Sequence, residues 1–429
     1  MSEERLSPGQ ATRLRVEAGL GKRYARERRF RFLGMLATVL GIAFLAVFFA
    51  SLVSQGSSAF QQTMVQLDVD FDSEYLAPYG VVDEDANFDA VVRNSLQELF
   101  PDVSSRRDRR ELFRLVSIGA AFQLQEMLSQ DPALLDKQAT VWVPVAANVD
   151  MLIKGNIDRD LPQEQRPLSD VDIERIDQLL ESGRLERHFN WALLNNGDSR
   201  EPELAGIRGA LVGSFYMLIV TIALAFPIGV AAAIYLEEFA PRNRWSDIIE
   251  VNINNLAAVP SIVFGLLGLA VFINWLSLPR SAPLVGGLVL SLLTLPVIII
   301  AARAAIKAVP PSIREAALGL GASRMQVIFH HVLPLAMPGM LTGAIIGMAR
   351  ALGETAPLLM IGMIAFIVDV PQKFTDPATA LPVQVFLWAD SPERAFAERT
   401  GAAIIVLLVF LLLMNLAAVL LRRRFERRW

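Results

Sequence analysis

Residues 310–338 read PPSIREAALGLGASRMQVIFHHVLPLAMP and separate two long apolar segments of the chain. The two prolines at the start are expected to end the preceding helix. Ser312 and Glu315 then have the S-x-x-E spacing of a capping box that begins another helix. Gly319 and Gly321 interrupt that helix, because glycine lowers helix stability. The first half of the segment therefore predicts a short helix that ends in a glycine turn.

The second half of the segment predicts another short helix. Ser323 and Gln326 have the S-x-x-Q spacing of a second capping box. Pro334 is expected to end this helix, because proline lacks the N–H group that a helix interior requires. The whole segment thus has the pattern of two short helices joined by a glycine turn.

The composition is typical of a membrane protein. Of the 429 residues, 53% are apolar, and the mean hydropathy is +0.41. The chain has no cysteine, which excludes disulfides and thiolate chemistry. Of its three histidines, His330 and His331 are neighbours about 100° apart on a helix, so a histidine metal site is not expected. No catalytic constellation or nucleic-acid-binding patch stands out, and the chain is not expected to be an enzyme.

Six apolar segments are long enough to cross a hydrocarbon core of ~30 Å. The first follows a basic stretch, residues 1–31, and its length favours a retained anchor over a cleaved signal peptide. The basic flanks, which include Arg242, Arg427 and Arg428, predict cytoplasmic N- and C-termini and a cytoplasmic segment 310–338. The expected spans are residues 32–53, 207–236, 248–274, 284–306, 339–368 and 402–421.

Residues 54–205 are expected to form a folded domain outside the cytoplasm. Apolar and polar residues alternate over 65–72, which is the pattern of a half-buried strand. Helical periodicity follows over residues 107–130 and 170–182, and β-prone apolar residues recur over 141–153. The alternating apolar positions are Val65, Leu67, Val69 and Phe71.

The predicted fold class is therefore an all-α polytopic membrane protein with an α+β insertion between its first and second of six spans. The insertion carries 28 acidic and 14 basic residues. This acidity is expected to be a solvated surface, with a docking face for a partner as the alternative.

The chain lacks the phosphate-binding loop G-x-x-x-x-G-K-[ST]. Gly19-Leu20-Gly21-Lys22 comes nearest to it but has no glycine at the required upstream spacing. If ATP drives this protein, a separate subunit must therefore supply the energy.

Three stretches together carry a resemblance to a known family. The first is the segment 310–338, which has the offsets of the EAA loop of ATP-binding-cassette (ABC) importer permeases, although His331 stands where that loop usually has isoleucine. The others are VPSIVFGLLGL, residues 259–269, and RALGETAPL, residues 350–358. With them the chain resembles the permeases of phosphate-specific ABC importers, most closely those of the PstA class, over residues 204–429. The matching EAA-loop positions are Glu315, Ala316, Ala317, Gly321, Leu333 and Pro334. Together with Ser312 they are the predicted ATPase-coupling residues.

The resemblance implies a multi-pass protein of a bacterial inner membrane that imports inorganic phosphate. Its EAA loop would dock on an ATPase dimer (PstB-like), which binds the ATP and Mg²⁺, whereas this chain binds no cofactor. A second permease (PstC-like) and a periplasmic phosphate-binding protein (PstS-like) are the other implied partners, besides membrane lipid. The segment between the first span and Leu204 resembles, less closely, an N-terminal extension that some PstA proteins carry.

Arg350 and Glu354 are the candidate substrate-pathway residues, with Thr355 of the same GETAP motif. On a helix they lie at i and i+4 and can pair. Each bare charge inside an apolar span costs roughly 2.5–3.5 kcal/mol, so such residues face a bundle interior or an aqueous path. Pro357 is expected to kink or open the helix beside them. Arg350 would then be a positive way-station for the phosphate dianion, with a structural ion pair as the alternative.

Arg303 and Lys307, near the inner end of the 284–306 span, are expected to reach towards lipid headgroups.

Two other functions remain open. One is a permease for another oxyanion, such as molybdate, sulfate or phosphonate, since the EAA loop is shared among importers of many solutes. The other is a membrane-anchored sensor or adaptor whose working part is residues 54–205. Deleting that domain would abolish the function of a sensor, whereas a permease could retain some transport.

Overall fold

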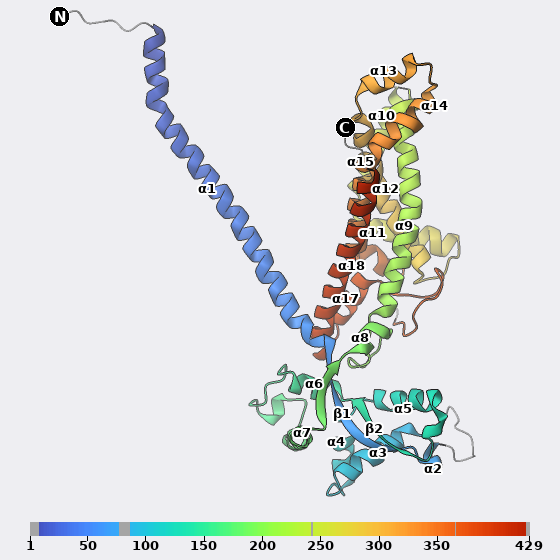
Figure 1. Ribbon diagram of the computed structural model, residues 1–429. Helices are drawn as coiled ribbons and strands as arrows, with labels where there is room; N and C mark the ends of the chain where they lie inside the picture. The colour runs from blue at the N-terminus through green and yellow to red at the C-terminus, as the bar shows by residue number, and fades with distance from the viewer. Residues whose placement is uncertain (1–7, 77–85, 242, 365, 426–429) are drawn as a thin grey trace, which may run out of the picture. The chain divides into compact units, whose positions relative to one another are not determined.

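The computed structural model describes residues 8–76, 86–241, 243–364 and 366–425 (Figure 1). Residues 1–7, Arg242 and residues 427–428, which contribute to the predicted orientation, lie outside the described residues. The chain divides into two compact units, Met1–Ser54 and Gln55–Trp429. The first unit is almost entirely helix α1 (Pro8–Ser57), a single helix of 50 residues that contains the expected first span.

Long apolar helices dominate the chain after residue 207. Together with α1, they give five helices in the described residues that could cross a membrane, and a bent helix pair would make a sixth. The predicted helical membrane architecture is thus confirmed. The long helices are α9 (Arg208–Ile234), α12 (Pro283–Lys307), α15 (Leu333–Gly353) and α18 (Ala395–Phe425). The shorter ones are α10 (Arg244–Ala257), α11 (Ser261–Gly268), α13 (Pro311–Gly319), α14 (Arg324–Val327), α16 (Ala356–Met360) and α17 (Leu381–Ala389).

The expected span 248–274 is not one straight helix. It consists of α10 followed by α11 and a π-helical turn, η5 (Leu269–Trp275), and the two halves are bent by 98°. The break falls at Pro260, which precedes the first residue of α11. Proline lacks an N–H donor and disfavours helical backbone in the residue before it, which explains why α10 ends at Ala257.

The expected span 339–368 is also shifted. Its helix starts much earlier, because α14 continues through the π-helix η6 (Ile328–Val332) into α15, and the candidate span is Arg324–Gly353. The helix then ends at Gly353, and the described residues of the expected span after α16, 361–364 and 366–368, are not helical. Pro334 therefore does not end a helix as expected. It lies in the first turn of α15, just after the π-helical turn, where a proline is tolerated.

Helix α12 is the centre of the bundle. In its most apolar stretch of 18 residues, 61% of the residues are buried. Small residues allow it to approach α9 closely. If Gly286 carried a Cβ atom, that atom would lie only 2.6 Å from the sulfur of Met217. A Cβ atom at Gly287 would lie only 2.5 Å from Cβ of Val220, so both positions are too close to α9 for a side chain. The Thr221 hydroxyl donates to the Met217 carbonyl of its own helix at 2.8 Å and also lies 3.3 Å from the Gly287 carbonyl oxygen of α12. The glycines of α12 thus position the two helices against each other.

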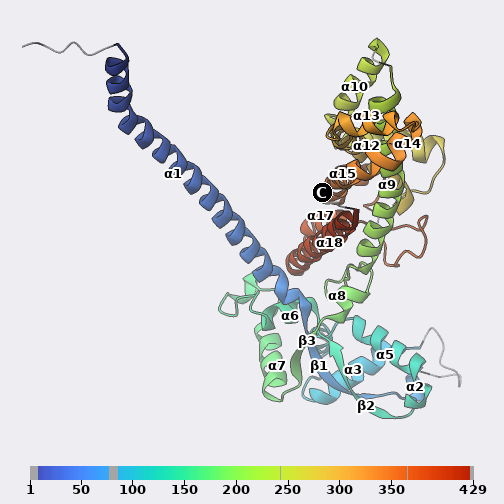
Figure 2. The same cartoon turned by 45° about the horizontal axis from the view of Figure 1, so that its top comes forward.

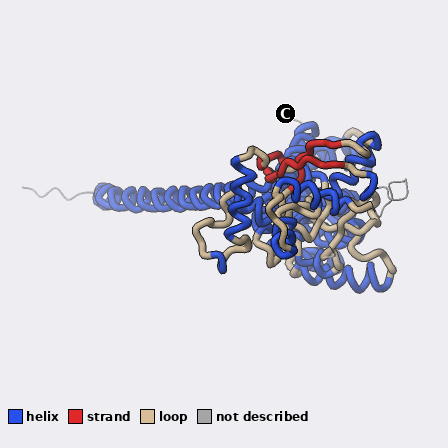
Figure 3. Tube along the Cα trace, turned by 90° about the horizontal axis from the view of Figure 1, so that it is seen from below, coloured by secondary structure: helices blue, strands red, loops and turns tan. Residues whose placement is uncertain are grey.

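A small antiparallel sheet forms the core of the domain between α1 and α9. Its strand order is β2-β1-β3, and Figure 3 shows it within a mainly helical fold. The strands are β1 (Gln61–Asp70), β2 (Gln138–Pro144) and β3 (Leu185–Phe189). The helices are α2 (Ser73–Leu76), α3 (Phe88–Leu99), α4 (Arg106–Phe113), α5 (Gly119–Gln130), α6 (Ala147–Ile153), α7 (Asp170–Glu181) and α8 (Trp191–Asn195). Short 3-10 turns are η1 (Ser58–Phe60), η2 (Pro132–Leu134) and η3 (Gln163–Gln165), and the π-helical turn η4 (Tyr235–Phe239) follows α9.

The predicted alternating strand is confirmed as β1. Val65, Leu67 and Val69 are at most 1% exposed and face the core, whereas Asp68 and Asp70 are exposed. The expected helical stretch 107–130 is two helices, α4 and α5, and residues 170–182 contain α7. The prediction of continued β-structure to residue 153 is wrong. Residues 147–153 form α6, which buries Val149, Met151 and Leu152 against the sheet domain core. Tertiary packing here overrides local β-propensity.

A buried ionic network joins this sheet domain to the first turn of α18. Lys154 Nζ lies 2.7 Å from Asp150 Oδ2 and 2.6 Å from Glu398 Oε1, and all three side chains are at most 8% exposed. Asn156 donates to the second Glu398 oxygen at 3.1 Å. Asp150 Oδ1 accepts hydrogen bonds from the backbone N–H and the hydroxyl of Thr63 on β1. The network therefore links strand, helix α6 and membrane helix through buried charges.

Candidate functional site

The first half of segment 310–338 forms α13, but its start differs from the expected capping box. Pro310 takes the cap position, and Ser312 lies inside the first turn without a capping hydrogen bond to Glu315. A proline at the start of the helix fixes the backbone there, so no side-chain cap is required. Gly321 has a φ of +86°, a conformation that other residues rarely adopt. It supplies the turn between α13 and α14.

The predicted second capping box is confirmed. Gln326 N–H donates to the Ser323 hydroxyl at 3.3 Å, and Ser323 N–H donates to the Gln326 side chain at 2.8 Å. Because both ends of the turn are defined, by Gly321 and by this box, α13 and α14 form a compact element. Figures 1 and 2 both place it beside α10, at the same end of α9 and α12.

This element exposes an apolar surface. Leu320 is 90% exposed, and Leu318, Met325 and Phe329 are each about half exposed. Glu315 and Ala316 are exposed as well, whereas Ala317 is buried against the bundle. Exposed large apolar side chains on a short loop element are typical of a protein-docking surface. Of the predicted coupling residues, Ser312, Glu315 and Ala316 are thus accessible, and Ala317, Leu333 and Pro334 lie on its inner side.

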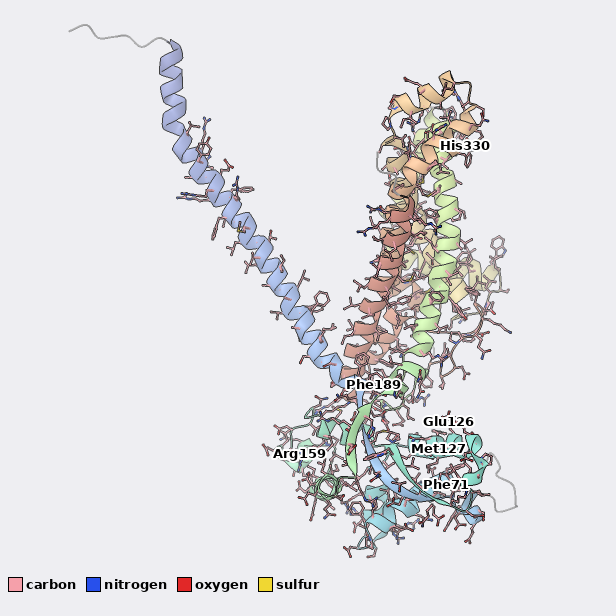
Figure 4. All side chains as sticks on the ribbon, in the orientation of Figure 1. Phe71, Glu126, Met127, Arg159, Phe189 and His330 are labelled. Atoms are coloured by element: carbon pink, nitrogen blue, oxygen red, sulfur yellow. The ribbon has the colours of Figure 1, made fainter. Side chains whose placement is uncertain are left out.

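A cavity of about 540 Å³ opens beside this element. His330 and His331 line it, together with Pro310, Ile313 and Pro334. Both histidines are exposed, and Figure 4 shows His330 at the end of the bundle that carries α13 and α14. The described residues contain no group of acidic or histidine side chains that could hold a metal ion. The cavity separates α13 from the start of α15.

Arg314 anchors α13 to the membrane helices. Its guanidinium donates to Glu238 Oε1 at 2.8 Å and to the carbonyls of Val309 and Ile306 at 2.7 and 3.0 Å. Glu238 lies in η4, the turn that follows α9, and is only 14% exposed. Charge-assisted hydrogen bonds of this kind are stronger than neutral ones. Arg314 therefore joins α13 directly to the turn at the end of α9.

A second ionic cluster involves Glu237, the residue before Glu238 in η4. Arg303 of α12 pairs with Glu237 at 2.5 Å and with Glu250 of α10 at 2.8 Å. Lys307 reaches the same Glu237 oxygen at 3.3 Å. The expectation that Arg303 and Lys307 reach towards lipid headgroups is wrong, because two elements, η4 and α10, bring carboxylates within their reach. Sequence reasoning missed Glu237 and Glu238, although two adjacent glutamates at the end of an apolar span were a usable signal.

Arg350 and Glu354 do pair, at an Nε–Oε1 distance of 3.5 Å, with side-chain exposures of 39% and 19%. Arg350 lies in the last turn of α15, while Glu354 already has extended backbone after the end of the helix. Instead of kinking a continuous helix, Pro357 lies in the first turn of the separate helix α16. Glu354 and the half-buried Thr355 are the two residues between the helices. The three predicted pathway residues thus lie close together in the chain, at a helix break that brings two charged side chains and a hydroxyl group to one place.

Comparison with known proteins shows which families and relatives this chain matches. Residues 207–429 match the family described as binding-protein-dependent transport system inner membrane component, and residues 17–163 match a domain of unknown function, DUF3333. The chain is 33% identical over 232 residues to the phosphate transport system permease protein PstA 1 of Mycobacterium tuberculosis, covering 54% of this chain and 74% of that protein.

Two further relatives match shorter stretches. The chain is 32% identical over 190 residues to the phosphate transport system permease protein PstA of Haemophilus influenzae, covering 44% of this chain and 66% of that protein. It is 39% identical over 155 residues to the probable ABC transporter permease protein YqgI of Bacillus subtilis, covering 36% and 52%. The match thus spans about half the length of YqgI and two thirds to three quarters of the two PstA relatives.

Proposed function

Because this chain belongs to the family of binding-protein-dependent transport system inner membrane components, as a permease of the PstA type, we propose that it passes inorganic phosphate inward across a bacterial inner membrane. It is a transport component and not an enzyme. The observation that carries the proposal is the 33% identity to a phosphate permease over 232 residues.

The energy for transport would come from ATP and Mg²⁺ on a partner ATPase dimer, similar to PstB. The exposed apolar surface of α13 and α14 supports this proposal, since it offers a docking face of the kind that such a subunit requires. Closure of the ATPase would displace α13, and the Arg314–Glu238 contact would pass that displacement to α9. Glu315, Gly321 and the residues around Pro334 shape this element.

Phosphate would pass near the break between α15 and α16. The positive charge of Arg350 would attract the dianion, and Glu354 would orient the guanidinium while keeping its hold on the anion weak. Weak binding matters, because a pathway residue that binds too tightly traps its substrate. Thr355 adds a hydroxyl at the same place. The incomplete burial of Arg350 supports this role better than that of a purely structural ion pair.

The remaining features of the assembly follow from the same proposal. The chain would have six spans with both termini in the cytoplasm, so that the basic flanks and α13 lie inside. A similar but different permease (PstC-like) would supply the other half of the pathway. A periplasmic phosphate-binding protein (PstS-like) would deliver the anion.

The test is uptake of radiolabelled phosphate at low micromolar concentration in cells whose own gene is deleted and replaced. We expect Arg350→Ala to lower phosphate uptake at least about tenfold, equivalent to about 1.4 kcal/mol, while Arg350→Lys retains part of it. Arg280→Ala is the matched control, because Arg280 is an exposed arginine in the loop before α12.

Sulfate and molybdate uptake are measured in the same cells. Normal phosphate uptake with Arg350→Ala would contradict the way-station role. Loss of sulfate or molybdate uptake on gene deletion, with phosphate uptake intact, would instead assign the chain to another oxyanion.

A further inference from the structure

The densest group of basic residues on the sheet domain is a row of arginines on α4. Residues 106–114 read RRDRRELFR and contain five of the 14 basic residues of the 54–205 region, which otherwise is strongly acidic. Arg106, Arg110 and Arg114 follow one another at intervals of four residues, so they lie along one face of the helix. The opposite face of α4 carries Leu112, which is fully buried in the core.

Neighbouring arginines extend this row into a surface. Arg109 is half-buried and donates to the Ser104 carbonyl at 2.9 Å. Arg93, from helix α3, lies over the ring of Phe113 at 5.7 Å from the ring centre. Two open hollows of about 570 and 710 Å³ lie between these side chains. We call the six residues the arginine face: Arg93, Arg106, Arg107, Arg109, Arg110 and Arg114.

The arginine face is poorly compensated within the described residues. Arg107 pairs with Glu111 at 3.3 Å, but Arg107 is 86% exposed. Arg106, Arg110 and Arg114 have no ion pair with any described side chain, and all three are exposed. Like charges four residues apart destabilise a helix. An arrangement that lowers the stability of its own helix indicates that the charges serve an interaction with something else.

The partner that this surface fits is a protein with a carboxylate-rich face. Guanidinium groups bind carboxylates through paired hydrogen bonds, and a cluster of them accelerates association with an acidic partner. A lipid surface fits less well, because Figure 1 places α4 in the part of the sheet domain away from α9 and α18. The family description names a dependence on a binding protein. Under the proposed function, that partner is the soluble protein that delivers phosphate to the permease.

We propose that the arginine face of α4 docks the soluble substrate-binding protein through a carboxylate-rich surface of that protein. This proposal rests on the proposed transport function. The face speeds the encounter of the binding protein with the permease. Its contribution lies in the association rate, because exposed charges act on encounter more than on the lifetime of a complex.

The experiment uses the complete transporter in lipid nanodiscs and the fluorescently labelled phosphate-binding protein of the same cell. The variant Arg106→Ala/Arg110→Ala/Arg114→Ala removes the row. A matched control, Lys137→Ala/Arg159→Ala/Arg187→Ala, removes three exposed basic residues elsewhere on the same domain (Figure 4 shows Arg159 beside α7). Loss of the row removes repulsion within α4, so the variant is expected to melt no lower than the wild type.

We expect the row variant to associate at least about tenfold more slowly than the wild type at low salt, with the difference shrinking at high salt. The control should change the rate much less. An unchanged rate, or the same change in the control, would overturn the proposal. Phosphate uptake by the wild type separates the two claims. If the wild type transports phosphate but the row variant associates normally, only the docking proposal fails. If the wild type transports no phosphate, the proposed function fails first.

Discussion

Replacing Lys154 by methionine tests how strongly the sheet domain is held to α18. Lys154 is 3% exposed and is the cation that lies between Asp150 and Glu398, at 2.7 and 2.6 Å. Methionine has a similar length but no charge, so the two buried carboxylates would lose their shared partner and repel each other. Removing one partner from a buried ion pair typically destabilises a protein by about 3–5 kcal/mol.

The surroundings place Lys154→Met at the lower end of that range. Asp150 keeps its two hydrogen bonds from Thr63, and Glu398 keeps the one from Asn156. The buried cation Arg399 also interacts with both carboxylates. We therefore expect a loss of about 3 kcal/mol, which for a domain of this size is a melting temperature lower by about 6–12 °C.

The assay is thermal unfolding of the purified protein in nanodiscs, followed by circular dichroism. Arg107→Met is the control, since it breaks an exposed pair and should leave the melting temperature nearly unchanged. Adding Glu398→Gln to Lys154→Met should recover part of the loss, because it removes one of the two repelling charges. A loss below about 1 kcal/mol, or a double variant less stable than the single one, would refute the reasoning.

Two further predictions concern a buried carboxyl and a turn. Burial raises the pKa of Glu203 above its ordinary value of 4.5, so its charged form destabilises the fold; this penalty is absent below that pH and grows as the pH rises. Glu203→Gln should therefore raise the melting temperature at pH 7 but not at pH 4, and an equal effect at both would contradict this. Gly321→Ala should strain the turn after α13 by about 1–2 kcal/mol and reduce phosphate uptake, because φ is +86° there. Gly319→Ala has equally open surroundings and no positive φ, so uptake as low as that of Gly321→Ala would argue against backbone strain as the cause.

Local patterns in the sequence predicted local structure well. Alternation over Val65 to Phe71 reflects one buried face of a strand, and β1 has that face. The spacing of Ser323 and Gln326 correctly predicted a capping box, since both partners lie within one helical turn. The family resemblance, which rested on short motifs, was confirmed by comparison with PstA permeases. Ser312 failed as a cap because Pro310 had already fixed the start of α13.

Pairings between distant residues were beyond sequence reasoning. Lys154 and Glu398 are 244 residues apart, and neither belongs to a motif or a periodic pattern. Arg303 meets carboxylates 66 and 53 residues away, because three helices end at the same level. The π-helical turn before α15 was missed as well. It lets the helix run past Pro334, and single-residue propensity gives no signal for it.

The Lys154–Glu398 contact also determines whether the chain between these two residues crosses the membrane an even or an odd number of times. Two residues in direct contact lie on the same face of the membrane, so the chain between them must cross it an even number of times. In the proposed topology, α9, α12 and α15 make three crossings, which alone would leave the two residues on opposite faces. We infer that the pair α10 and α11 makes the fourth. Its 98° bend is then a bend within one passage through the bilayer, and not a return to the face from which the chain entered.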